Sequence, residues 1–169
     1  MADLPLYGKL AQGRVALVDD ADLPLLSGYR WHLSRRGYPR AYLPGTKGRT
    51  VNLHQLLRAP DGSGYRDHVS GDPLDNRRVN LRPCTVEENN RNRRAHRNNK
   101  TGFKGVSAFG SGFRAVIHQG RRQIYLGTFP HVLLAALAYN AAATALHGPF
   151  ARLNDVDLTP LLGGSNAAD

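Results

Sequence analysis

The first half of the chain alternates between short apolar runs and clusters of turn-forming residues. A run of acidic residues from Asp19 followed by leucines predicts one or two turns of helix, with Pro24 limiting where the helix starts. Three further runs predict the strands of a small sheet: residues 29–33, 37–43 and 49–53. Their aromatic residues are expected to pack in the core or on the sheet rather than to form a ligand cage: Trp31, Tyr38 and Tyr42.

A strand–loop–strand–helix unit is predicted next. It follows a short apolar helix that contains Leu53, Leu56 and Leu57 and a glycine-rich turn. Residues 67–69 predict the first strand and residues 80–82 the second, with a loop of turn residues between them.

The helix of this unit is predicted from a capping signal. Thr85 is followed three residues later by Glu88, the spacing of a capping box. The helix should therefore begin near Val86 and carry Asn89 in its first turn.

The second half of the chain predicts three strands and one long helix. The runs GVSAF, FRAVIH and QIYLGTF are joined by hairpin turn signals at Gly110 and Gly120, and an alanine-rich helix spans residues 131–146. The basic stretch RNRRAHRNNK at 91–100 has no apolar residue larger than alanine, which predicts a domain boundary. The predicted domains are residues 1–97 and 98–154, with a mobile tail at 155–169.

Composition excludes several classes of protein. The chain has 169 residues, of which 41% are hydrophobic, enough for real cores. A single cysteine, Cys84, excludes an internal disulfide framework and a cysteine-rich zinc site. The longest apolar stretch, residues 132–146, is too short to span a bilayer, and the first residues lack a signal-peptide pattern. We therefore expect a soluble intracellular protein without a membrane partner.

Positive charge is concentrated in the second half. The net charge is +10, and residues 91–154 hold ten basic side chains and no acidic one. Such a field favours a phosphate backbone as partner, although a solvated basic face is an equally simple interpretation of the run alone.

Four residues of the strand–loop–strand–helix unit are candidates for catalysis. Asp67 and Asn89 offer oxygen ligands that suit a hard divalent ion, and His68 lies on the opposite face of the strand from Asp67, where its imidazole could activate a water. Asn80 completes the set. The simpler alternative is that the Asp-His pair caps a turn, that Asn80 bonds a loop backbone and that Asn89 is solvated.

These residues resemble a known family. The segments DHVSGDPLDNRRVNLRP and TVEENNRN are similar to the HNH motif of homing endonucleases, whose ββα-metal site cuts DNA. The resemblance extends upstream to Trp31, Gly37-Tyr38 and Leu53-His54. It implies that His68 is the general base, that Asn80 orients it, and that Asp67 and Asn89 hold Mg²⁺ or Mn²⁺. His54 matches a family position for which helix packing is the default role.

The second half resembles the ethylene-response-factor (AP-two) DNA-binding domain over residues 98–154, in the segments KGVSAF, FRAVIH, YLGTF and AALAYNAAATALHGPFARLN. This resemblance implies that a three-stranded sheet contacts the major groove and is supported by one helix. Many of that family's base-reading arginines and tryptophans are replaced here, so DNA binding is implied more firmly than specificity. The expected DNA-binding residues of the whole chain are Arg77, Arg78, Arg93, Arg94, Lys100, Lys104, Ser107, Arg114, His118, Arg121, Arg122 and Tyr125.

The sequence thus predicts an α+β protein with a small N-terminal sheet, a ββα-metal HNH module, and a three-stranded antiparallel sheet packed on one helix. The expected activity is hydrolysis of a DNA phosphodiester to 5′-phosphate and 3′-hydroxyl ends. A single site in a monomer would nick double-stranded DNA, and a bacterial or phage origin is expected from the resemblance. The alternatives are a non-catalytic DNA-binding regulator derived from such a nuclease and an RNA-binding protein, the latter disfavoured because the chain lacks an aromatic stacking platform.

Overall fold

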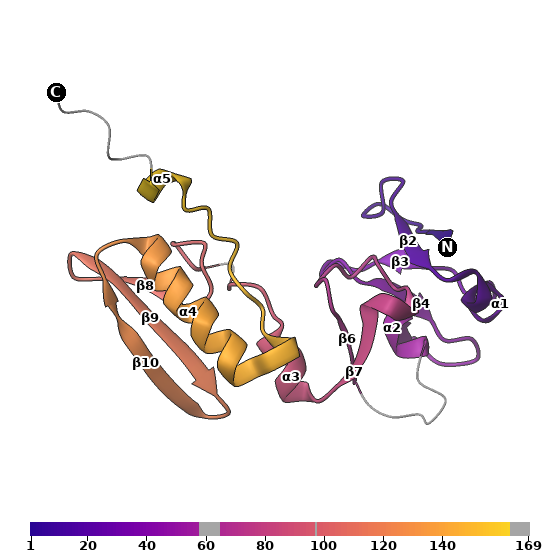
Figure 1. Cartoon of the computed structure of the whole chain (residues 1–169). Helices are drawn as coiled ribbons and strands as arrows, with labels where there is room; N and C mark the ends of the chain where they lie inside the picture. The colour runs from indigo at the N-terminus through magenta and orange to yellow at the C-terminus, as the bar shows by residue number, and fades with distance from the viewer. Residues whose placement is uncertain (58–64, 97, 163–169) are drawn as a thin grey trace. The chain divides into compact units, whose positions relative to one another are not determined.

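The structure, a computed structural model, describes residues 1–57, 65–96 and 98–162. The chain divides into two compact units, Met1–Asn90 and Arg91–Asp169. The named strands (Figure 1) pair in small antiparallel sheets. Each unit has a hydrophobic core of its own. The fold is therefore mixed α and β, as predicted.

The first unit is built from short elements, which follow one another as β1 (Ala2–Pro5), β2 (Val15–Val18), η1 (Asp20–Asp22), α1 (Leu23–Leu26), β3 (His32–Leu33), β4 (Pro39–Tyr42), β5 (Thr50–Asn52), α2 (Leu53–Leu56), β6 (Tyr65–His68), η2 (Arg78–Asn80), β7 (Leu81–Cys84) and α3 (Val86–Arg91). The strands form two hairpins, β1–β2 and β6–β7, and one three-stranded sheet in the order β3-β4-β5. The unit boundary falls within α3.

The core of the first unit is centred on Trp31, which is 1% exposed. Its indole Nε1 donates a hydrogen bond of 3.1 Å to the carbonyl of Leu26, so the one polar atom of the side chain is satisfied. The cluster includes leucines from β1, α1, β3, α2 and β7: Leu4, Leu26, Leu33, Leu53 and Leu81. The β6–β7 hairpin thus shares a core with the preceding sheets.

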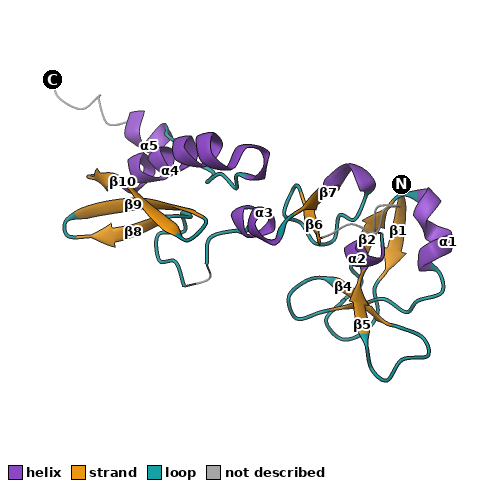
Figure 2. Ribbon diagram, turned by 90° about the horizontal axis from the view of Figure 1, so that it is seen from below, coloured by secondary structure: helices purple, strands orange, loops and turns teal. Residues whose placement is uncertain are grey.

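The second unit contains β8 (Val106–Phe109), β9 (Gly112–Gln119), β10 (Arg122–Phe129), α4 (Val132–His147), η3 (Gly148–Phe150) and α5 (Thr159–Leu162). The strands form one antiparallel sheet in the order β10-β9-β8, and α4 lies along one of its faces (Figure 2). The imidazole of His131 caps α4 by accepting a hydrogen bond from the backbone N–H of Leu133.

Small residues let α4 approach the sheet closely. Ala135, Ala136 and Ala143 are fully buried in α4. Gly105 has φ +76°, and a Cβ there would lie 2.1 Å from the Tyr139 ring and 2.6 Å from the Val116 carbonyl oxygen. A side chain at residue 105 would therefore push α4 away from the sheet.

The predicted elements are present. Of the aromatic residues expected in the core or on the sheet, Trp31 is in the core, and Tyr42 lies on β4 with 64% of its surface exposed. The second compact unit begins at Arg91. The glycine-rich turn at 58–64 lies outside the described residues, and the predicted tail contains α5 in its described part. No helix in the described ranges is long and apolar enough to cross a membrane.

Candidate active site

The β6–β7 hairpin places Asp67 and His68 on opposite faces of one strand. Asp67 is opposite Arg82 in the antiparallel register, and His68 is opposite Leu81. Successive side chains of a strand point to opposite sides, so the two residues meet different surroundings. Both are buried, at 6% and 5% exposure. This separation was predicted.

Asp67 is held by Arg82. Its Oδ2 accepts hydrogen bonds from Nη2 at 2.8 Å and from Nε at 3.2 Å. The pair lies largely within the protein, where leaving one partner alone would be costly. We did not predict this partner, because it follows from the hairpin register rather than from residue type.

His68 is oriented by Asn76. The imidazole Nε2 lies 3.2 Å from Asn76 Oδ1, and Asn76 is completely buried. The Asn76 Nδ2 donates to the Pro73 carbonyl at 3.0 Å, which fixes the amide with its oxygen toward the ring. An amide oxygen only accepts, so His68 Nε2 carries the hydrogen. The lone pair of the neutral ring is then on Nδ1.

Asn80 holds the loop rather than the imidazole. Its Oδ1 accepts from the Ser70 N–H at 2.9 Å, and its Nδ2 donates to the Asp75 carbonyl at 2.6 Å. The resemblance implied that Asn80 orients His68. In the structure the Asn80 amide bonds backbone groups on both sides of the loop, as in the simpler alternative, and the hydrogen bond of the imidazole is to Asn76. The sequence signal for the contact between Asn76 and His68 was the adjacent Asp75 and Asn76 in the segment GDPLDN.

Strand β2 ties the loop down from the other side. The Leu17 N–H donates to the Leu74 carbonyl, and the Asn76 N–H donates to the Leu17 carbonyl, both at 2.8 Å. These main-chain bonds fix the peptide of the residue whose side chain orients His68. The N-terminal hairpin therefore positions the candidate base without contributing a side chain to it.

His68 belongs to a small cluster of rings. The ring centroid of His54 is 5.0 Å from that of His68, and the Tyr38 centroid lies 6.0 Å from it. Burial lowers the pKa of His68, against the opposing effects of the Asn76 hydrogen bond and of Asp67. Burial, followed by the neighbouring His68, lowers the pKa of His54 to about 4. Both imidazoles are therefore neutral at neutral pH.

Asn89 is half-buried in the first turn of α3, as predicted. The capping box forms in both directions, with the Thr85 N–H donating to Glu88 Oε2 at 2.7 Å and the Glu88 N–H donating to Thr85 Oγ1 at 3.2 Å. Within the described residues, no group of three His, Cys, Asp or Glu side chains could hold a metal ion. A metal at this site would therefore use mixed carboxylate and amide oxygens, and the oxygen donors of Asp67 and Asn89 fit a hard divalent ion.

Two arginines expected to contact DNA are engaged inside the first unit. Arg77 Nη2 lies 2.6 Å from Asp75 Oδ2, and Arg78 Nη2 lies 2.5 Å from Asp22 Oδ1. These bidentate pairs offset the positive charge that a phosphate would use. Arg78 therefore links the loop to η1, and Arg77 bonds Asp75 within the loop; neither contact was predicted from the sequence.

The sheet of the second unit presents a face that α4 does not cover. Ala115 and Ile117 are buried on the α4 side, whereas Arg114, Val116 and His118 alternate away from it, as predicted. The Arg114 guanidinium lies 5.3 Å from the Phe109 ring centroid. Most of the other residues of this unit that we expect to contact DNA are exposed: Arg93, Arg94, Lys100, Arg121, Arg122 and Tyr125. Ser107 is half-buried.

Lys104 differs from these residues. Its ammonium donates to the Arg91 carbonyl, and burial, followed by Arg152, lowers its pKa to about 8. Its backbone N–H also donates to Asn154 Oδ1 at 2.6 Å. Lys104 thus links segments of the second unit, so the expected phosphate contact competes with this internal bond.

The chain is similar to a viral protein. It is 29% identical over 152 residues to a protein of Acanthamoeba polyphaga mimivirus named as an uncharacterized HNH endonuclease, and the match covers 86% of this chain and 78% of the relative. No protein-family model matches the chain, and no solved structure does. The similarity supports a nuclease of the HNH type.

Proposed function

We propose that this protein is a metal-dependent HNH-type DNA endonuclease that nicks duplex DNA. The observation that carries the proposal is the buried imidazole of His68, which lies next to Asp67 on β6 and is held through Nε2 by the buried Asn76. Similarity to a viral protein named as an HNH endonuclease supports the same activity.

His68 acts as the general base in this proposal. Its lowered pKa leaves the imidazole unprotonated at neutral pH, so Nδ1 can accept a proton from a water that attacks the phosphorus. Attack that expels the 3′ oxygen leaves 5′-phosphate and 3′-hydroxyl ends. Asn76 prevents the ring from turning, and Asn80 stabilises the loop that carries Asn76.

Asp67 and Asn89 are the proposed ligands of Mg²⁺ or Mn²⁺. When bound, such an ion stabilises negative charge on the phosphate and on the departing oxygen. Arg82 already bonds one carboxylate oxygen of Asp67 and so orients the carboxylate.

The second unit, over residues 98–154, is proposed to bind duplex DNA. It supplies basic side chains and no carboxylate, and the face of its sheet away from α4 carries Arg114, His118 and Tyr125. One such site in a monomer hydrolyses one phosphodiester, so a nick is the expected product.

A supercoiled-plasmid assay tests the activity. With Mg²⁺, wild-type protein should convert supercoiled to open-circular DNA, and His68→Ala should lower the rate by at least about 10²-fold because the base is lost. His96→Ala, at an exposed histidine outside the hairpin, should nick at the wild-type rate.

Two results would contradict the proposal. Equal nicking by His68→Ala and wild type would remove His68 from the reaction. DNA binding without nicking of any tested duplex by the wild-type protein would favour the alternative, a DNA-binding regulator that does not cut.

A further inference from the structure

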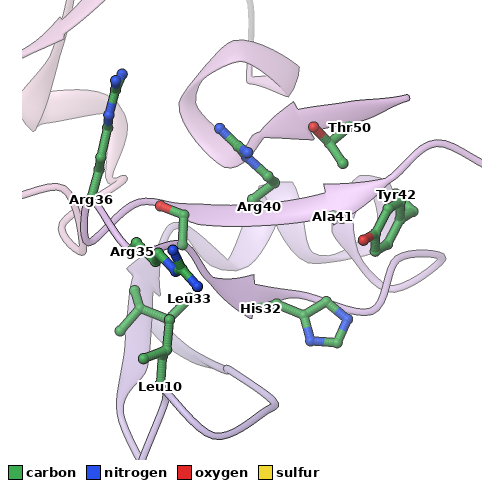
Figure 3. Close-up of a pocket in the computed structure, with 10 residues that line it drawn as sticks. Leu10, His32, Leu33, Arg35, Arg36, Arg40, Ala41, Tyr42 and Thr50 are labelled. Atoms are coloured by element: carbon green, nitrogen blue, oxygen red, sulfur yellow. The ribbon is translucent and has the colours of Figure 1, made fainter. Parts of the chain in front are cut away.

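A basic hollow lies on the outer face of the β3-β4-β5 sheet, apart from the candidate active site. Its volume is about 770 Å³. Its polar lining comes from β3, β4, β5 and the β3–β4 turn and includes His32, Arg35, Arg36, Arg40, Tyr42 and Thr50. Figure 3 shows the three arginines spread over one part of the hollow, with the rings of His32 and Tyr42 at the other end.

The sheet register gathers these side chains on one face. His32 is opposite Arg40, and Arg40 is opposite Asn52, so three polar residues cross the sheet in one row. Tyr42 and Thr50 form the next row. The intervening positions on β3 and β4 are buried in the core of the unit: Leu33, Pro39 and Ala41. The polar face is therefore a fixed surface of a packed sheet.

Positive charge in the hollow is not neutralised by the protein. No acidic side chain lines it, and in the described part of the chain no carboxylate forms an ion pair with Arg35, Arg36 or Arg40. Arg40 is oriented by a hydrogen bond of 3.2 Å from its Nε to Asn52 Oδ1. This bond does not use the two terminal nitrogens of the guanidinium.

The contrast with other arginines of the same unit is informative. Arg77, Arg78 and Arg82 each form an ion pair with an aspartate. The other described arginines of the first unit form no ion pair with a described carboxylate, and the hollow brings three of them, Arg35, Arg36 and Arg40, together on one face.

We propose that this hollow binds the phosphate backbone of duplex DNA, which gives the first unit a DNA contact apart from its proposed active site. This inference rests on the proposed function. Guanidinium groups form paired hydrogen bonds with phosphate oxygens, and arginine is only weakly hydrated. The Tyr42 ring, 64% exposed and 6.4 Å from the His32 ring, offers a flat surface for the sugar between phosphates.

A charge-matched pair of variants tests the inference in the full chain. One variant carries Arg35→Gln, Arg36→Gln and Arg40→Gln; the control carries Lys9→Gln, Arg14→Gln and Lys47→Gln at exposed positions of the same unit that do not line the hollow. Fluorescence anisotropy with a short DNA duplex in EDTA measures binding without cleavage. We expect the first variant to lose about tenfold or more in affinity at low salt. Its slope of log K against log salt should fall by about 2 to 3. The control should change less than about twofold.

Amide chemical shifts locate the contact. Adding the duplex to wild-type protein should shift the backbone resonances of His32, Arg40 and Thr50. Shifts confined to residues 98–154, or equal losses of affinity in the two variants, would overturn the inference. Preference for duplex RNA over duplex DNA in the same titration would overturn the assignment to DNA. If the triple variant melts early, Arg35→Gln and Arg36→Gln alone, both in the exposed turn, provide the comparison.

The outcomes separate this inference from the proposed activity. Wild-type protein that never nicks DNA, while the Arg35/Arg36/Arg40 variant loses affinity, would refute cleavage and keep the hollow. Wild-type protein that nicks, while this variant binds and nicks as wild type does, would refute the hollow and keep cleavage.

Discussion

His54 is a buried histidine that lacks a hydrogen-bond partner for Nδ1 among the described residues. Burial, followed by the neighbouring His68, lowers its pKa from 6.5 to about 4. The unfolded chain therefore binds more protons than the folded one between these pH values. Stability should be complete above pH 6.5 and should decrease as the pH falls toward 4, by about 3 kcal/mol for this residue.

Replacing His54 with phenylalanine should remove much of this acid sensitivity. The ring would still pack against Tyr38, and no proton would be taken up on unfolding. Urea unfolding of His54→Phe across this pH range should give a smaller loss of unfolding free energy than wild type shows. The exposed His96, replaced in the same way, is the control and should follow wild type. An unchanged slope for His54→Phe would show that the residue titrates normally in the folded state.

Among the elements, α3 is short enough to depend on its cap. It has six residues, and the reciprocal bonds of Thr85 and Glu88 satisfy backbone groups at its start. Thr85→Ala should cost about 1 kcal/mol and fray the turn that carries Asn89. We expect several-fold weaker binding of Mn²⁺, measured by electron paramagnetic resonance of the free ion with full-length protein.

Thr85→Ser is the matched control, because serine keeps the capping hydroxyl. It should bind Mn²⁺ as wild type does. Wild-type affinity in Thr85→Ala would show that Asn89 does not depend on the cap or does not bind the ion.

The cap of α3 is an example of a local contact that the sequence can predict. Thr85 and Glu88 are three residues apart, so their cap was predicted and is confirmed. Alternation in β9 likewise identified the buried Ala115 and Ile117. The contacts that build the candidate site are less local.

Long-range partners were not predictable from local pattern. Arg78 pairs with Asp22 across 56 positions. The strand pairing of β1 with β2 was also not predicted, because runs of four residues are too short to show a clear strand pattern. Choosing Asn76 over Asn80 as the partner of His68 required the three-dimensional course of the loop.

For the whole molecule, we expect DNA affinity and metal binding to be separable. The second unit has its own core, and Arg114, Arg121 and Arg122 are well separated in sequence from Asp67 and Asn89. The triple variant Arg114→Gln, Arg121→Gln, Arg122→Gln should bind duplex DNA at least about tenfold more weakly at low salt. Mn²⁺ affinity and the melting of the first unit should stay at their wild-type values.

Anisotropy with duplex DNA and the same Mn²⁺ titration provide the two measurements. Unchanged DNA affinity would remove these arginines from the interface. A parallel loss of Mn²⁺ binding would show that the two units do not work separately.

The main-chain bonds between Leu17 and the loop at Leu74 and Asn76 have a consequence for protein engineering. A fragment of residues 65–91 would carry Asp67, His68 and Asn89 without the β1–β2 hairpin that braces the loop between β6 and β7. Such a fragment would keep the candidate site residues and lose the main-chain bonds that fix Asn76, the partner of His68. We therefore expect that a transplanted version of the candidate site must include the N-terminal strands.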